Sequence, residues 1–217
     1  MKKINSIFKK NFNSTFNKFK DFTMVSHDCY NDNLLIAGQV LNIEGDIVEC
    51  GVWRGGMIAG IADILGNNRH YHLFDSFEGL PEPQEIDGKS AIEWKNNVNG
   101  EFYYDNCKAE IEYANKAMGL ANVNFTCIKG WFNETIPANQ EIKKIALLRL
   151  DSDWYESTYI CLEYLFDKVV IGGIIIIDDY LTWDGCSKAV HDFLSKTKSS
   201  CKIRQSSNNV IYIIKQD

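Results

Sequence analysis

The chain has 217 residues, 45% of them hydrophobic; this length supports one sizeable core and is short for two, so a single domain is expected. Seven cysteines without a CxxC pair fit neither a disulfide framework nor a zinc site, which indicates reduced thiols in a cytoplasmic protein. The net charge of −6 combines a lysine-rich start with a more acidic remainder, and this acidic remainder argues against a nucleic-acid partner. No apolar stretch is long enough for a transmembrane segment.

Residues 1–22 carry the pattern of an amphipathic, basic helix ahead of a single domain at 23–217. Apolar side chains recur there at helical spacing among six lysines, at Ile4, Phe8, Phe12, Phe16 and Phe19. Such a helix can bind a membrane surface or a partner. Alternatively, its phenylalanines cover the domain or a homodimer interface while the lysines stay solvated, and we favour this second interpretation.

From residue 46 onward, short β-rich segments alternate with helical ones, which predicts an α/β fold with a parallel sheet covered by helices. Strands are predicted at 47–53, 71–74, 123–130, 144–150, 173–177 and 210–214, and helices at 57–65, 105–118, 157–166 and 186–196. The polar run 206–209 between 202–205 and 210–214 predicts a C-terminal antiparallel hairpin. Residues 81–100 lack clear periodicity, and a loop of that length in a compact domain is often a lid.

The first predicted strand carries an acid and leads into closely spaced glycines, at Glu49, Gly51, Gly55 and Gly56. Ligands of open α/β sheets bind at this end of a strand, and glycines let the backbone approach them. The spacing is GxxxGG rather than the GxGxxG of dinucleotide sites, so S-adenosylmethionine, which has a sulfonium and no phosphate, fits better. Asp75 ends the next strand, where a carboxylate can bind ribose hydroxyls. Glycine and aspartate also occur at such turns for conformational reasons alone.

Two further strands end in paired acids. Residues 144–150 run into Asp151 and Asp153, and residues 173–177 run into Asp178 and Asp179. The 27 residues from Asp151 to Asp178 leave room for one crossover helix, so the strands are predicted to be parallel neighbours with their acids side by side. Such acids can cap the following helices. We favour a divalent cation such as Mg²⁺, because four adjacent carboxylates repel one another unless they are neutralised.

The chain resembles the macrocin O-methyltransferase family, which modifies sugar hydroxyls on antibiotics, from about residue 23 to the C-terminal strand. The resemblance is carried by the segments 23–26, 45–56, 75–81, 150–157 and 172–180, and more weakly by 130–137. It implies a Rossmann-like class I methyltransferase fold with a mostly parallel seven-stranded sheet. The implied activity is S-adenosylmethionine-dependent, Mg²⁺-dependent O-methylation of a sugar or glycosylated metabolite, with a small-molecule or glycan acceptor.

The resemblance also implies roles for particular residues. Mg²⁺ would be bound by Asp151, Asp178 and Asp179, and Asp153 would be the general base. S-adenosylmethionine would be held by seven residues, namely Glu49, Gly51, Gly55, Gly56, Asp75, Ser76 and Trp131. Met57 stands where the family usually has a small or hydroxyl residue, and Glu134 stands where an aspartate is expected, so contacts to both ends of the cofactor can differ here.

Other functions also fit the Asp-x-Asp pattern. A metal-dependent glycosyltransferase of the DxD type binds a nucleotide sugar with the same pair of acids. An aspartyl-nucleophile phosphatase also uses Asp-x-Asp, but it needs more chain between its acid pairs than this sequence provides. A catalytically silent cofactor-binding subunit is the non-enzymatic alternative, and the four intact aspartates count against it.

Overall fold

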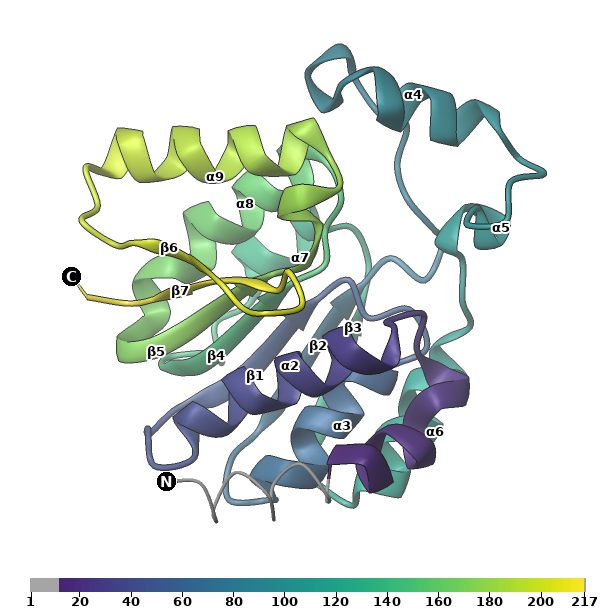
Figure 1. Cartoon of the computed structure of the whole chain (residues 1–217). Coiled ribbons are helices and arrows are strands. Elements are labelled where there is room, and N and C mark those ends of the chain that lie inside the picture. Colours follow the sequence, from purple (N-terminus) through teal and green to yellow (C-terminus); the bar gives the residue numbers. More distant parts are fainter. Residues whose placement is uncertain (1–11, 217) are drawn as a thin grey trace.

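The computed structural model describes residues 12–216, and Ile4 and Phe8 of the predicted N-terminal helix lie outside this range. Within it, seven strands form one sheet in the order β3-β2-β1-β4-β5-β7-β6 (Figure 1). The strands are β1 (Asp46–Cys50), β2 (Tyr71–Asp75), β3 (Phe125–Lys129), β4 (Ile145–Leu150), β5 (Val169–Ile177), β6 (Ile203–Gln205) and β7 (Ile211–Ile214). The first five pair in parallel, and the last two are antiparallel. The predicted mostly parallel sheet with a C-terminal hairpin is confirmed.

Helices cover both faces of this sheet, as Figure 1 shows. One face is covered by α2 (His27–Ala37), α3 (Gly56–Leu65) and α6 (Ile111–Ala121), and the other by α7 (Phe132–Ala138), α8 (Tyr155–Leu165) and α9 (Asp184–Thr197). Successive strand side chains point to opposite faces. Accordingly, Ile174 and Ile176 belong to one hydrophobic core, and Ile175 and Ile177 belong to the other. A strand buried on both sides has to be apolar throughout, which explains its run of isoleucines.

The N-terminal helix packs onto the domain where it is described. Phe12 and Phe19 are buried, and Phe16 packs against the same core. Asp63 of α3 receives a hydrogen bond of 2.9 Å from the Thr15 hydroxyl and an ion pair of 2.6 Å from Lys18 Nζ. These contacts favour phenylalanines that cover the domain. Among residues 12–216, no helix combines the length and hydropathy of a membrane-spanning segment.

The predicted helix at 105–118 is wrong in its first turn, because α6 begins only at Ile111. Residues 104–107, labelled α5 (Tyr104–Cys107), instead form a left-handed turn with φ between +46° and +59°. Tertiary contacts hold this disfavoured conformation. Asn106 bonds Leu80 twice, through its carbonyl to the Leu80 N–H at 3.0 Å and through Nδ2 to the Leu80 carbonyl at 2.8 Å.

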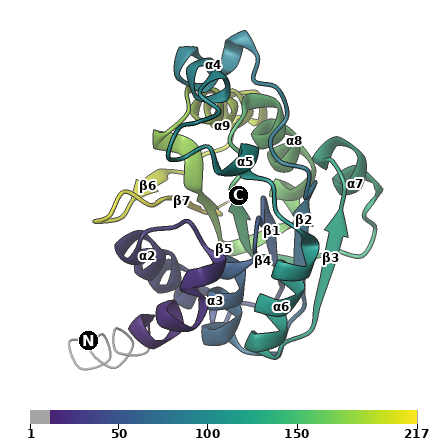
Figure 2. The same cartoon turned by 90° about the vertical axis from the view of Figure 1, so that its right-hand side faces the viewer.

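The segment predicted as a lid contains regular structure that its sequence did not indicate. A 3₁₀ turn, η3 (Glu85–Asp87), precedes α4 (Lys89–Asn96). Figure 2 shows α4 beyond the carboxyl ends of the strands, next to α9. Asp87 is buried and accepts hydrogen bonds from the backbone N–H groups of Gln84 and Tyr155, each at 2.7 Å. The bond from Tyr155 attaches the segment to the start of α8. The helices α2 and α7 were also not predicted from the sequence.

Candidate active site

The carboxyl ends of the central strands lie level with one another. Residues that pair side by side form one row across β2, β1, β4 and β5, namely Phe74, Cys50, Leu150 and Ile177. The residues that follow share one edge, at Asp75, Gly51, Asp151 and Asp178. A Cβ on Gly51 would lie 1.6 Å from the Asp151 carbonyl oxygen, so only glycine fits beside that strand end. The predicted convergence of acids from neighbouring strands is therefore present.

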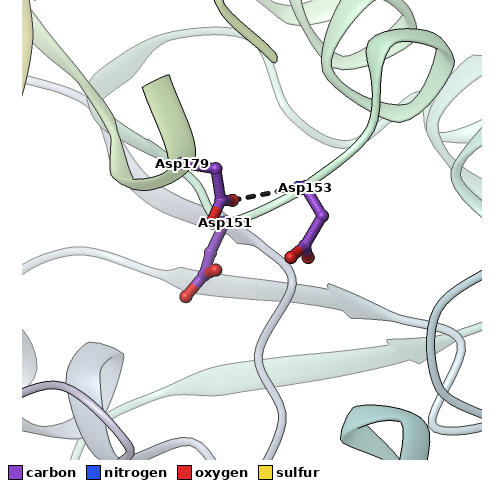
Figure 3. Close-up of side chains that lie close together, drawn as sticks. All are labelled: Asp151, Asp153 and Asp179. Carbon is purple, nitrogen blue, oxygen red and sulfur yellow. Dashed lines mark hydrogen bonds between the residues drawn. The ribbon is translucent and has the colours of Figure 1, made fainter. Parts of the chain in front are cut away.

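Three aspartates at this edge bring their carboxylates close together. Asp151, Asp153 and Asp179 each contribute an oxygen, and these oxygens lie within 4.8 Å of one another (Figure 3). Asp179 Oδ2 also accepts a 2.9 Å hydrogen bond from the backbone N–H of Asp153, whose φ is +55°. Carboxylate oxygens at this separation suit a hard divalent cation. The residues present thus fit Mg²⁺.

Burial and mutual repulsion raise the pKa values of these acids. The pKa of Asp151 rises to about 6, mainly through burial and then through the charge of Asp178. The pKa of Asp153 rises to about 8, mainly through burial and then through Asp151, although a 3.0 Å hydrogen bond from Trp183 Nε1 to its Oδ1 opposes the rise. A bound cation would reverse these shifts, because it favours the charged form of each acid.

Asp178, the fourth aspartate, pairs with a buried arginine. Arg149 is 1% exposed and donates from Nη2 to Asp178 Oδ1 at 2.5 Å. Its Nη1 donates to Asp151 Oδ2 at 2.8 Å and to Glu49 Oε1 at 2.9 Å. One guanidinium therefore joins the acid of β1 to the acids after β4 and β5. Sequence reasoning did not select Arg149, although it is the one charged residue within the apolar run 145–150.

Glu49 is the most enclosed acid of the site. Its side chain is 1% exposed, and its Oε2 has no hydrogen-bond partner among the described residues. Burial raises its pKa to about 8, although Arg149 opposes this shift. A buried oxygen without a partner is costly, so this atom marks a place where a ligand can donate a hydrogen bond or bring a positive charge.

Asp75 is already satisfied by backbone donors. Its Oδ2 accepts from the N–H groups of Val52 at 2.7 Å and Trp53 at 2.8 Å, and its Oδ1 accepts from Phe77 at 2.6 Å. Burial raises its pKa, and these three hydrogen bonds lower it. The next residue, Ser76, donates its hydroxyl to the Gly79 carbonyl at 2.9 Å. These bonds fix the turns after β1 and β2 in one conformation.

The other two predicted glycines have a packing reason as well. A Cβ on Gly55, whose φ is +82°, would lie 2.8 Å from Ala114 Cα of α6. A Cβ on Gly56 would lie 2.6 Å from the Phe22 carbonyl. Both glycines thus allow close packing of the helix start against neighbouring backbone, in addition to any approach of a ligand.

One cavity of about 970 Å³ connects all these groups, which is within the range of small-molecule sites. It is lined by Glu49, Gly51, Gly56, Asp75, Ser76, Trp131 and the four aspartates, whereas Gly55 is not among its lining residues. Trp131 precedes α7 and is 36% exposed. The segment that carries α4 also lines the cavity, through residues that include Trp94 and Phe102.

Comparison with known proteins identifies relatives of the whole domain. Residues 22–214 match the family model described as macrocin-O-methyltransferase (TylF). The demethyldecarbamoylnovobiocin O-methyltransferase of Streptomyces niveus is 34% identical over 163 residues, which cover 71% of this chain and 60% of that protein. A tetracenomycin-C rhamnosyl 4'-O-methyltransferase of Streptomyces olivaceus is 35% identical over 159 residues, covering 70% and 58%. The match thus spans about three-fifths of these relatives' length.

Solved structures agree with this assignment. The O-methyltransferase NovP superposes with a TM-score of 0.76 at 27% identity, covering 90% of this chain and 83% of that one. The calicheamicin methyltransferase CalS11 has a TM-score of 0.64 at 20% identity, over 96% and 93% of the two chains, and shares the fold. The chain therefore belongs to the macrocin O-methyltransferase family.

Proposed function

We propose that the protein is an S-adenosylmethionine-dependent, Mg²⁺-dependent O-methyltransferase that acts on a sugar hydroxyl. The observation that carries the proposal is the position of the three-aspartate group, which shares one cavity with Glu49 and Asp75. One relative is named as the 4'-O-methyltransferase of a rhamnosyl tetracenomycin, which supports the acceptor class. Methyl transfer needs the acceptor oxygen and the methyl carbon in line, and a single cavity with both sets of groups supplies that alignment.

The cofactor residues in this proposal are those at the ends of β1 and β2. Glu49 offers its free Oε2 to the positively charged part of S-adenosylmethionine, and Asp75 offers its remaining lone pairs to the ribose. Gly51, Gly55 and Gly56 keep the turn compact, Ser76 holds the turn after β2, and Trp131 supplies a wall beside the cofactor.

The acid residues at the ends of β4 and β5 divide into ligands and a base. Asp151, Asp178 and Asp179 are proposed as Mg²⁺ ligands, with Asp153 as the base that accepts the acceptor's proton. Mg²⁺ supplies charge that lowers the pKa of a neighbouring hydroxyl. Trp183 holds Oδ1 of Asp153, which leaves Oδ2 to accept that proton.

The geometry also favours a second assignment of the ligands. Asp153 lies in the three-oxygen group, whereas Asp178 Oδ1 bonds to Arg149. In this version Asp153 is a ligand, and Asp178 positions Arg149. The two assignments differ in whether Asp153→Asn or Asp178→Asn weakens Mg²⁺ binding.

The experiment that tests the function is calorimetry with S-adenosylhomocysteine, with and without Mg²⁺. We expect the purified protein to bind the cofactor product, and Mg²⁺ to bind with an affinity that Asp179→Asn lowers by about tenfold or more. Unchanged Mg²⁺ binding in Asp179→Asn would contradict the metal site. Binding of a nucleotide sugar in place of S-adenosylhomocysteine would instead favour the DxD-type glycosyltransferase.

A further inference from the structure

Two left-handed segments that are distant in sequence meet at the cavity. Trp53, in the turn after β1, has a φ of +48°, and the residues of α5 have φ between +46° and +59°. Trp53, Tyr104 and Cys107 all line the cavity. A tryptophan in this conformation is uncommon and persists only where its surroundings hold it. The contacts of Trp53 therefore indicate what this conformation is for.

Trp53 is held through both its backbone and its ring. Its backbone N–H donates to Asp75 Oδ2 at 2.8 Å. Its ring centroid lies 4.4 Å from Cζ of Arg54, and the same guanidinium lies 4.8 Å from the ring centroid of Tyr113 in α6. A cation over two aromatic rings is attracted to both of them. Asp75 thus fixes the backbone of Trp53, and Arg54 fixes its ring relative to α6.

The ring of Trp53 contacts the second left-handed segment. Its centroid lies 6.2 Å from that of Tyr104, and the two ring planes are inclined at 65°, which is an edge-to-face contact. Tyr104 begins α5, and Asn106 of the same turn bonds twice to Leu80. Asn106 Oδ1 also accepts a 3.0 Å hydrogen bond from Lys95 Nζ of α4. One series of contacts therefore joins the turn after β1 to α4.

Trp53 also carries a buried polar atom without a partner. Its indole Nε1 has no hydrogen-bond acceptor among the described residues. Buried donors are rarely left in this state, because an unsatisfied donor is costly. Since Trp53 lines the cavity, a ligand that brings an acceptor to Nε1 would satisfy this atom and fix the ring further.

None of the four residues of α5 is buried, so few contacts oppose its local opening. We infer that Trp53 is a positioning residue that holds α5, and with it the α4 side of the cavity, against the turn after β1. Arg54 acts through Trp53 by fixing its ring. The response of α5 to a bound cofactor rests on the proposed function, whereas the positioning of α5 is a property of the chain alone.

The test is amide hydrogen exchange, which measures local opening. Three backbone N–H groups bond to carbonyl groups of residues 103–106 at 3.0–3.1 Å, those of Leu80, Cys107 and Lys108. In ligand-free protein, Trp53→Leu should speed their exchange by about tenfold or more, because the left-handed turn loses its ring contact. Trp53→Phe keeps a ring and should speed exchange less. Exchange within about twofold of wild type in both variants would overturn the inference.

Two controls show whether the effect is local. Trp131→Leu makes the same substitution at another cavity tryptophan and should leave the three amides within about twofold of wild type. The N–H of Ser206, which bonds to the Val210 carbonyl at 2.9 Å in the C-terminal hairpin, should exchange equally in wild type and Trp53→Leu. An equal acceleration in Trp131→Leu, or at Ser206, would mean that the whole protein is loosened and would refute a positioning role.

Substitutions of Arg54 test whether its charge fixes the ring. Arg54→Lys keeps a cation beside Trp53 and Tyr113, whereas Arg54→Met keeps only an apolar chain. Exchange at Cys107 should therefore be faster in Arg54→Met than in Arg54→Lys, by about threefold or more. Equal exchange in the two variants would contradict the role given to Arg54, because packing alone would then explain it.

The last measurement adds S-adenosylhomocysteine at concentrations that saturate each protein. Its binding should slow exchange at Leu80, Cys107 and Lys108 by about fivefold or more in wild type and by less than about twofold in Trp53→Leu. Equal slowing in both proteins would show that Trp53 does not carry the response. If wild type does not bind S-adenosylhomocysteine, the proposed function is wrong, and the ligand-free exchange rates still decide whether Trp53 positions α5.

Discussion

The two ends of the cavity hold their carboxylates in opposite ways. At the end proposed for the cofactor, Asp75 accepts three backbone hydrogen bonds, so the chain itself supplies its partners. At the proposed metal end, Asp153 and Asp179 have no ion pair with a basic side chain among the described residues, burial raises the pKa of both, and the charge of Asp153 raises the pKa of Asp179 further. The chain itself therefore organises the first end, whereas the second end would be stabilised by the proposed cation.

Arg149 connects these two ends, and its removal should have the largest effect on stability. Arg149→Met leaves Glu49, Asp151 and Asp178 without their shared positive charge, and breaking a buried ion pair from one side costs about 3–5 kcal/mol. Urea denaturation measures the loss. The double variant Arg149→Met/Glu49→Gln should recover part of it, because one buried carboxylate is then neutral. If Arg149→Met lowers the free energy of unfolding by less than about 1 kcal/mol, Arg149 does not couple the two ends of the cavity.

At the proposed metal end, single Asp→Asn substitutions distinguish the Mg²⁺ ligands from the general base. If Asp153 is the base, Asp153→Asn should lower turnover by about 10²–10³-fold and keep S-adenosylhomocysteine and Mg²⁺ binding. Asp178→Asn should instead weaken Mg²⁺ binding, which calorimetry measures. Asp167→Asn is the control, because that side chain is 96% exposed and distant from the cavity. Weaker Mg²⁺ binding in Asp153→Asn, with normal binding in Asp178→Asn, would instead make Asp153 a Mg²⁺ ligand and would leave Asp178 to position Arg149.

At the cofactor end, Asp75→Asn tests whether the backbone bonds alone organise the turns. The amide keeps one acceptor oxygen but turns an NH₂ group toward backbone N–H donors, so stability should fall by about 1–3 kcal/mol. The affinity for S-adenosylhomocysteine should fall by about tenfold in calorimetry. Ser76→Ala removes only a hydroxyl contact to the Gly79 carbonyl and should change both quantities less. Equal effects of the two variants would contradict the role given to Asp75.

The smallest predicted effect is the pH dependence of stabilisation by Mg²⁺. The folded pKa values of Asp151 and Asp153, about 6 and about 8, lie above the value near 4 of an unfolded aspartate. Metal-free protein should therefore lose stability as pH rises from about 4 through 8, since these acids ionise. Mg²⁺ binds the ionised acids, so its thermal shift should grow by about 3 °C between pH 5 and pH 8. A shift that is constant or falls with pH would contradict this.

The errors in the predicted elements have a common cause. The left-handed turn at 104–107 is held by contacts between Asn106 and Leu80, and the helix α4 has only one buried residue, Ala91. A helix that buries little has no strong apolar period, and a turn held by distant contacts has no local signature. Hydrophobic periodicity therefore predicted the apolar strands but did not predict the helix α4 or the turn at 104–107.

The sequence by itself determined the sheet and the edge at which the acids meet. Apolar strands that end in acids, such as 145–150 before Asp151, place those acids together because parallel strands end on the same side. The tertiary structure alone decided that Arg149 takes Asp178 as a partner, and that Trp94, Trp154 and Trp183 contact one another. These contacts depend on side-chain directions and on the path of a segment without periodicity, which no local pattern encodes.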